Sequence, residues 1–192
     1  KSHYNLVKGA SPEALYCLNV RSNSNMMRWN SSGEYNMTFG ERNCFSKTRL
    51  EKHAELCKDT EFLNLDFSQA LDVLYERGYN FKEVVIYIDS PYSGTTATYN
   101  TGWTDANDRL LLSRVKALHQ EGAKIVMSNV FENRGCINQW LIDWCETNKD
   151  LFEVHEMNIS YGNSSFRKSD KKTREVLIVS KEGFSIFNPT TK

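Results

Sequence analysis

The segment 84–92 constrains the fold more than any other part of this 192-residue sequence. Residues 84–88 (Val-Val-Ile-Tyr-Ile) are apolar or aromatic and mostly β-branched, so they predict a strand. Because no polar residue interrupts them, we expect both faces of this strand to be covered, as in a parallel sheet. Ligands of open α/β sheets bind past the carboxyl ends of such strands. We therefore expect a ligand site at Asp89 and Tyr92, which follow the strand.

The composition is that of a globular protein with one domain and room for a small second one. Hydrophobic residues make up 40% of the sequence and aromatic residues 12%, and no apolar run reaches membrane-spanning length. The five cysteines are odd in number and form no CxxC pair, so we expect reduced thiols in a cytoplasm. The histidines show no metal-ligand spacing, and we expect no metal site.

The formal net charge is zero, but two segments are basic. The first fifty residues and the stretch 166–174 each carry more lysine and arginine than acid. Local basic segments on a neutral chain suit a polyanion site, and two solvated loops are the alternative interpretation.

Predicted strands and helices alternate along the chain, and strands follow one another near its end. This order favours an α/β sheet with an antiparallel edge. Helices are predicted from residue 12, at 46–57, at 68–77, from 104 to 122, and around residues 137–144. Strands are predicted at 61–65, 84–88, 124–129, 152–159, 175–180 and 184–187. We interpret 26–39 as a β-hairpin and 93–102 as a ligand loop.

Four sequence blocks follow the order found in Dam-type adenine-N6 DNA methyltransferases, and the chain most resembles those of T-even phages. The blocks are the hairpin from Ser24 to Gly40, the segment Asn64-Leu65-Asp66-Phe67, the motif Asp89-Ser90-Pro91-Tyr92 with Tyr99, Asn100 and Trp103 after it, and the strand end Met127-Ser128-Asn129-Val130. The resemblance implies an incomplete Rossmann-like methyltransferase sheet. It also implies a small DNA-recognition region over 1–58 and the C-terminal part of a catalytic core over 59–192.

The resemblance further implies transfer of a methyl group from S-adenosylmethionine to an adenine flipped out of double-stranded DNA. The implied catalytic residues are Asp89, Ser90, Pro91 and Tyr92, and the implied cofactor contacts are Asp66, Phe67 and Asp89. The implied DNA contacts are Ser24, Met26, Arg28, Asn30, Thr38, Tyr99, Asn100, Arg167 and Lys168. Arg28 would bind O6 and N7 of a guanine in a GATC-like site.

Some positions depart from the family pattern. Ser90 and Thr38 stand where proline is usual, and Asn23 stands where related enzymes often have an intercalating aromatic residue. Ser90 can still offer its backbone carbonyl, with less rigidity than proline. The two hairpin departures leave the GATC target open.

No two glycines lie close enough to form the family's cofactor loop. We therefore expect part of a longer polypeptide, one subunit of a split enzyme with a separate N-terminal half, or a chain that has lost cofactor binding. We do not expect this chain to methylate by itself. The alternative is a catalytically inactive DNA-binding or protein-interaction relic of the same scaffold, and RNA or protein methylation is a weaker third option. The expected location is the cytoplasm of a bacterium or of a phage-infected host.

Overall fold

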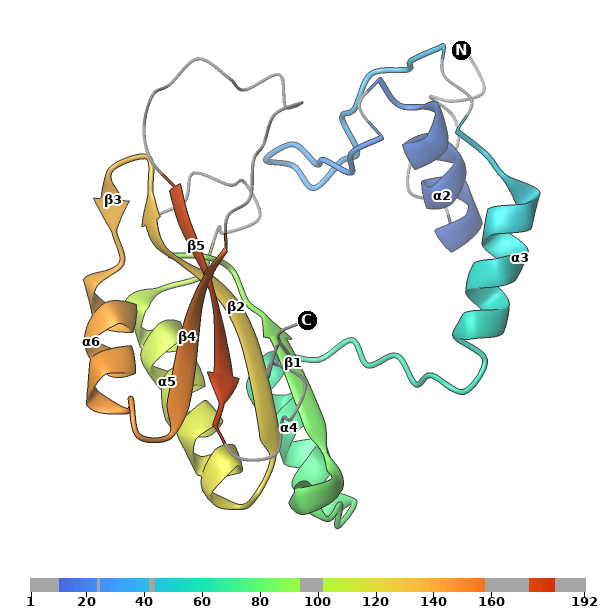
Figure 1. The fold of residues 1–192 in the computed structure, drawn as a ribbon. Helices are drawn as coiled ribbons and strands as arrows, with labels where there is room; N and C mark the ends of the chain where they lie inside the picture. Colours follow the sequence, from blue (N-terminus) through green and yellow to red (C-terminus); the bar gives the residue numbers. More distant parts are fainter. Residues whose placement is uncertain (1–10, 24, 42–43, 94–101, 158–172, 182–192) are drawn as a thin grey trace, which may run out of the picture. The chain divides into compact units, whose positions relative to one another are not determined.

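The structure, a computed structural model, describes residues 11–23, 25–41, 44–93, 102–157 and 173–181. The chain divides into two compact units, Lys1–Phe62 and Leu63–Lys192 (Figure 1). Among these described residues, no helix is both long enough and apolar enough to cross a membrane.

The two helices in the described part of the first unit begin where the sequence predicts. The N-cap of α2 (Pro12–Arg21) is Ser11, and the N-cap of α3 (Lys47–Leu56) is Ser46. Each serine side chain accepts a hydrogen bond from a backbone N–H of the first helical turn, which has no partner inside the helix. Helix α2 contributes the buried Leu18, whereas α3 buries none of its side chains.

The turn of the predicted β-hairpin at 26–39 is present in the structure. The Asn30 side-chain oxygen accepts hydrogen bonds from the backbone N–H groups of Ser32 and Glu34, at 3.0 and 2.9 Å. Gly33 completes the turn with a φ of 74°. Regular strands do not flank this turn, so the hairpin prediction is only partly right. Within the described part of the first unit, the antiparallel pairing consists of two isolated bridges, Ser22 with Phe39 and Trp29 with Tyr35.

Local interactions interrupt the ladder of this hairpin. The Met26 carbonyl accepts a hydrogen bond from the Tyr35 hydroxyl at 3.2 Å. Asn25 has a φ of 52°, in the left-handed region that an extended strand does not contain. The core below the hairpin is small and consists of Leu18, Tyr35 and Met37, with Leu15 and Phe39 packed against it.

The second unit contains a mixed sheet with the strand order β1-β2-β5-β4. The strands are β1 (Val85–Asp89), β2 (Lys124–Asn133), β4 (Phe152–Met157) and β5 (Thr173–Ser180), and the short β3 (Cys136–Ile137) pairs with β2. Strand β1 runs parallel to β2, whereas β5 is antiparallel to both of its neighbours, β2 and β4. The predicted α/β sheet with an antiparallel edge is therefore confirmed.

Helices α4 (Phe67–Glu76), α5 (Asp105–Gln120) and α6 (Gln139–Thr147) lie on one face of this sheet, and η1 (Phe81–Glu83) precedes β1 (Figure 1). The helix predicted from 104 to 122 is α5, and three residues at helical spacing on it are buried in one core with the sheet; they are Leu111, Val115 and Leu118. Ile137, which we expected in a helix, instead lies in β3 before α6 begins. The predicted strand at 184–187 lies outside the described residues.

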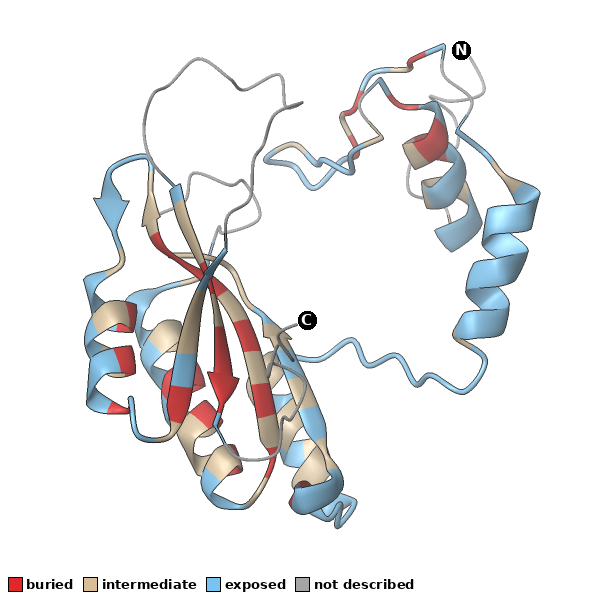
Figure 2. Cartoon of the chain, viewed as in Figure 1, coloured by how far each residue is buried: buried red, intermediate tan, exposed pale blue. Residues whose placement is uncertain are grey.

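Strand β1 is covered on one face only, so the prediction of a strand buried on both faces is wrong. Ile86 and Ile88 pack against the core, but Val85 and Tyr87 expose 57% and 63% of their surface (Figure 2). The alternation is not visible in the sequence because the exposed residues are also apolar or aromatic. Among the described strands, β1 pairs with β2 alone and so forms an edge of the sheet.

The predicted strand at 61–65 is also wrong. These residues have no regular secondary structure, and the Phe62 side chain is 74% exposed. A strand needs a neighbour for its backbone N–H and C=O groups, and no described strand lies beside this segment. The segment also contains no β-branched residue, and only Phe62 has a high strand propensity.

Candidate functional site

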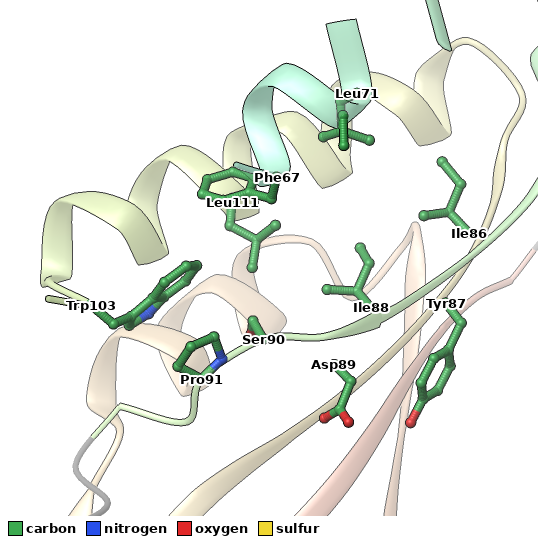
Figure 3. A pocket seen from close by; sticks show the side chains of 11 residues that line it. Phe67, Leu71, Ile86, Tyr87, Ile88, Asp89, Ser90, Pro91, Trp103 and Leu111 are labelled. Carbon is green, nitrogen blue, oxygen red and sulfur yellow. The ribbon is translucent and has the colours of Figure 1, made fainter. Parts of the chain in front are cut away.

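Two cavities meet at the carboxyl end of β1, where they share Asp89, Ser90 and Pro91. The first, which we name the apolar cavity, has a volume of about 320 Å³ and lies among β1, α4 and α5 (Figure 3). It is lined by Phe67, Ala70, Leu71, Ile86, Tyr87, Ile88, Asp89, Ser90, Pro91, Trp103 and Leu111. The second, the motif cavity, is also about 320 Å³ and is lined by Asp89, Ser90, Pro91 and Tyr92 among the described residues.

A helix start places Phe67 on the wall of the apolar cavity. Asp66 caps α4, because its carboxylate accepts a hydrogen bond from the Ser68 N–H at 3.0 Å while the Gln69 side chain accepts one from the Asp66 N–H at 3.2 Å. Two hydrogen bonds from Ser68 lower the pKa of Asp66, and the bond from its hydroxyl has a larger effect than the bond from its N–H. The Asp66 side chain is thus engaged in the cap and does not line the cavity.

Trp103 adds a second aromatic ring to the lining of the apolar cavity and contacts Phe67. Its ring centroid lies 5.6 Å from that of Phe67. The indole Nε1–H donates to the Asp108 carboxylate at 2.7 Å, and the Ser93 hydroxyl donates to the same carboxylate. These bonds fix the indole against the first turn of α5. Two aromatic rings around an apolar space suit a planar, partly apolar ligand.

The Asp89 carboxylate is held by hydroxyl groups on one of its two oxygens. Oδ1 accepts hydrogen bonds from the Tyr92 hydroxyl at 3.2 Å and from Ser128 Oγ at 3.0 Å. Ser128 lies directly opposite Asp89 in the parallel pairing of β1 with β2. Among the described residues, none donates a hydrogen bond to Oδ2.

The pKa of Tyr92 is raised above 10.0, chiefly because burial disfavours the phenolate, and the charge of Asp89 adds to this effect. We expect the titration of Tyr92 to have its midpoint above pH 10.0. The midpoint is measured from the absorbance difference between this protein and its Tyr92→Phe variant during alkaline titration. The pKa of Tyr92 is higher in the folded protein than in the unfolded chain. The contribution of the neutral phenol to the free energy of unfolding is therefore complete below the unfolded pKa and is lost as pH rises through the folded pKa. A difference titration with its midpoint at or below 10.0 would contradict this assignment.

The catalytic residues expected from the sequence are brought together. Asp89, Ser90, Pro91 and Tyr92 lie at the junction of the two cavities, and Phe67 lies on the wall of the apolar one. The roles of these residues stay predictions. Among the described residues, no group of three or more His, Cys, Asp or Glu side chains could hold a metal ion.

The expected DNA contacts in the first unit have clear local environments. Arg28 is exposed, and its Nε donates to the Asn36 side-chain oxygen at 2.9 Å. Asn30 uses its side chain in the turn and in a 3.0 Å hydrogen bond to Glu34. Met26 is 53% exposed, and Thr38 is exposed as well. The other expected contacts lie outside the described residues; they are Ser24, Tyr99, Asn100, Arg167 and Lys168.

Three residues of the site had no assigned role in the sequence prediction. Ser128 and Trp103 belong to blocks that carry the resemblance, and Tyr87 belongs to the apolar strand. The signal for Ser128 was its place at the end of an apolar run, where parallel strands present polar groups to a ligand. Nothing in the sequence indicates the Tyr87 hydroxyl as a partner of Ser128.

Comparison with known proteins assigns the chain to a family. Residues 12–162 match the model for D12 class N6 adenine-specific DNA methyltransferases. The chain is 31% identical to the modification methylase StsI of Streptococcus sanguinis, over 98% of this chain and 30% of that protein. It is 30% identical to the type II methyltransferase M.FokI of Planomicrobium okeanokoites, over 93% of this chain and 28% of that protein.

A third relative is the retron Ec67 DNA adenine methylase of Escherichia coli, with 29% identity over 58% of this chain and 38% of that protein. The chain therefore spans less than two fifths of the length of each of these three relatives. The family match covers most of both units and includes Phe67, Asp89 and Tyr92. This chain belongs to the D12 class of N6 adenine-specific DNA methyltransferases.

Proposed function

We propose that this chain carries the catalytic and target-recognition portion of a site-specific DNA adenine-N6 methyltransferase that uses S-adenosylmethionine. The observation that carries the proposal is the junction at Asp89. There, an apolar cavity with two aromatic walls meets a second cavity lined by Tyr92. One cavity suits a nucleoside-like cofactor and the other suits a flipped base.

The apolar cavity fits the adenosyl part of S-adenosylmethionine, because Phe67 and Trp103 offer aromatic surfaces beside aliphatic side chains. When bound, this cofactor supplies an electrophilic methyl group on a sulfonium. We assign Phe67 and Asp89, which line the apolar cavity, to cofactor binding. The Asp66 carboxylate caps α4 one residue before Phe67, and its contact with the cofactor stays a prediction.

In the motif cavity, Asp89 Oδ2 would accept a hydrogen bond from the amino group of the target adenine. The lone pair of that amino nitrogen is delocalised into the ring, so the nitrogen is a weak nucleophile. Hydrogen bonds to a carboxylate and to the Ser90 carbonyl would favour a tetrahedral amino nitrogen. Its lone pair could then displace the thioether from the methyl group, and its extra proton would pass to solvent. Tyr92 offers a ring for stacking on the flipped base. Pro91 restricts the backbone between these groups.

The Ser90 hydroxyl is not needed for this role. Its Oγ is buried and has no hydrogen-bond partner among the described residues. The contribution of Ser90 is therefore assigned to its backbone carbonyl, as at the proline that is usual in related enzymes.

We further propose that the first unit binds the double-stranded DNA target. Arg28 donates to Asn36 through Nε, so this bond does not use its two terminal nitrogens. Bidentate contact with a guanine requires donors of this kind. Several finer points stay predictions: a GATC-like site, closeness to the T-even phage enzymes, and DNA contacts by Met26, Asn30 and Thr38. The same is true of the expected DNA contacts outside the described residues and of a cytoplasmic location.

The sequence contains no pair of closely spaced glycines that could cradle the cofactor. We therefore propose that a glycine-rich loop is supplied from outside these residues, either by the same polypeptide or by a separate subunit. The same observation favours the second candidate function, an inactive DNA-binding or interaction relic. The organised Asp89 carboxylate counts against the relic, because a chain without catalysis has no need of it.

Replacing Phe67 by alanine tests the cofactor site. We expect the Kd for S-adenosylmethionine to rise about 10-fold, because aromatic stacking on one base contributes about 1–3 kcal/mol. The measurement is titration calorimetry on the protein expressed from its complete coding sequence. Phe62→Ala is the matched control, since the Phe62 side chain is 74% exposed. Equal affinities for the parent protein and the Phe67→Ala variant would exclude the apolar cavity as the cofactor site, and absence of binding in both would favour the relic.

A further inference from the structure

Two hydroxyl groups, of Tyr87 and Ser128, form a chain that ends on the Asp89 carboxylate, and a third, of Tyr92, donates to it directly. The Tyr87 hydroxyl donates to Ser128 Oγ at 3.2 Å, and Ser128 Oγ donates to Asp89 Oδ1 at 3.0 Å. The Tyr92 hydroxyl donates to the same Oδ1 at 3.2 Å. The bonds from Ser128 and Tyr92 converge on one oxygen of the carboxylate, so they set its rotation and direct Oδ2 away from these two donors.

The sheet fixes the position of Ser128 relative to Asp89. The two residues are a register pair in the parallel ladder of β1 and β2, and Ser128 is also paired with Leu177 of β5. A side chain on a paired interior strand has less freedom than one on a loop. Ser128 is therefore a rigid donor, whereas Tyr92 lies past the end of β1.

Tyr87 donates to Ser128 Oγ and so limits where the single proton of the Ser128 hydroxyl can point. A serine hydroxyl donates one hydrogen bond and accepts others. Ser128 Oγ has three acceptors within reach, which are Asp89 Oδ1 at 3.0 Å, the Ile88 carbonyl at 3.4 Å and the Tyr92 hydroxyl, whose pKa a hydrogen bond from Ser128 lowers. The bond from Tyr87 occupies a lone pair of Ser128 Oγ and leaves its proton for an acceptor, of which the carboxylate is the charged one.

We infer that Ser128 is a positioning residue for Asp89 and that Tyr87 supports it. The inference rests on the proposed methyl transfer and adds the residues that orient its acceptor. Ser128 and Tyr87 act through Asp89; Tyr87 also lines the apolar cavity, and the part of it that supports Ser128 is its hydroxyl. Tyr87 is 63% exposed on the outer face of β1, so its hydroxyl can be removed with little loss of packing.

The test compares Ser128→Ala, Ser128→Thr and Tyr87→Phe in DNA methylation by the protein expressed from its complete coding sequence. Ser128→Ala removes a hydrogen bond to a charged group. Because such a bond contributes more free energy than a neutral one, we expect kcat to fall about 10-fold, with KM for both substrates unchanged. Ser128→Thr keeps the hydroxyl and should recover most of the rate. Tyr87→Phe should lower kcat about 3-fold, because it removes a neutral hydrogen bond.

Ser113→Ala and Tyr79→Phe are the matched controls, because both residues are exposed and lie away from Asp89. Urea unfolding of each variant separates a change in rate from a change in folding. The decisive variant is the double mutant Asp89→Ala/Ser128→Ala. Its single-turnover rate should equal that of Asp89→Ala, because Ser128 has no carboxylate left to orient.

A further rate loss in the double mutant would overturn the inference. A Ser128→Ala variant whose kcat equals that of the parent protein would also overturn the inference. In that case the proposed function would still stand, provided that Asp89→Ala is inactive in the same assay. Absence of methyl transfer by the parent protein is a different result. It removes the proposed function and this inference together.

Discussion

Replacing Asp89 by alanine is expected to lower the rate of methyl transfer to DNA about 100- to 1,000-fold, the usual effect of losing one group that stabilises a transition state by hydrogen bonding. Asp89 offers the only side-chain carboxylate among the described lining residues of the motif cavity. Its Oδ1 is occupied by Ser128 and Tyr92, and Oδ2 faces no described donor. The rate should be measured under single-turnover conditions with saturating DNA and S-adenosylmethionine.

Asp150→Ala is the control for this variant, because Asp150 is an exposed acid in the turn after α6. Its rate should match that of the parent protein. The Asp89→Ala protein should still bind duplex DNA, since it loses only the proposed contact with the flipped adenine and keeps the other expected DNA contacts. A rate within a few-fold of the parent would mean that Asp89 does not face the reacting nitrogen.

Replacing Leu118 by alanine is expected to lower the free energy of unfolding of the second unit by about 2–5 kcal/mol, the range for truncation of a fully buried leucine. Leu118 is 0% exposed and lies in the core formed by α5 and the sheet. The loss combines the transfer free energy of the removed methyl groups with the cavity that remains. Equilibrium urea unfolding, followed by tryptophan fluorescence, measures it.

Leu110→Ala on the same helix is the matched control. Leu110 is 42% exposed, so its truncation should change the unfolding free energy by less than about 1 kcal/mol. Equal losses in the two variants would contradict the orientation of α5. The comparison isolates burial, because the substitution and the helix are the same in both.

The helices of the second unit could be predicted because their signals are local. Leu111, Val115 and Leu118 follow the helical period, and all three are buried. Gly78 and Gly122 follow the predicted helix ends and have φ values of 66° and 104°, which glycine adopts without strain.

The exposure of β1 could not be predicted because it depends on the neighbours of a strand. Val85 and Tyr87 have the composition of a buried strand, yet they face away from the helices. Which strand forms an edge is decided by pairing between segments far apart in the sequence. The failed strand at 61–65 has the same origin, since apolar residues form a strand only where a partner accepts their backbone hydrogen bonds.

In the candidate site, too, the residues with local sequence signals could be predicted and those that depend on distant pairing could not. Asp89 and Tyr92 could be predicted because they follow an apolar strand and belong to one short motif. The partner of Asp89 could not, because Ser128 lies 39 residues away and meets it only through the register of β1 with β2. Trp103 is similar, since its place on the cavity wall depends on the packing of α5 beside α4.

The most direct test of the central claim is identification of the methylated product. Duplex DNA of mixed sequence is incubated with methyl-labelled S-adenosylmethionine and the protein expressed from its complete coding sequence, then digested to nucleosides and separated. The account predicts label in N6-methyl-2′-deoxyadenosine, and its loss in the Asp89→Ala variant. Label on another base or on protein, or label in adenine that persists without Asp89, would contradict it.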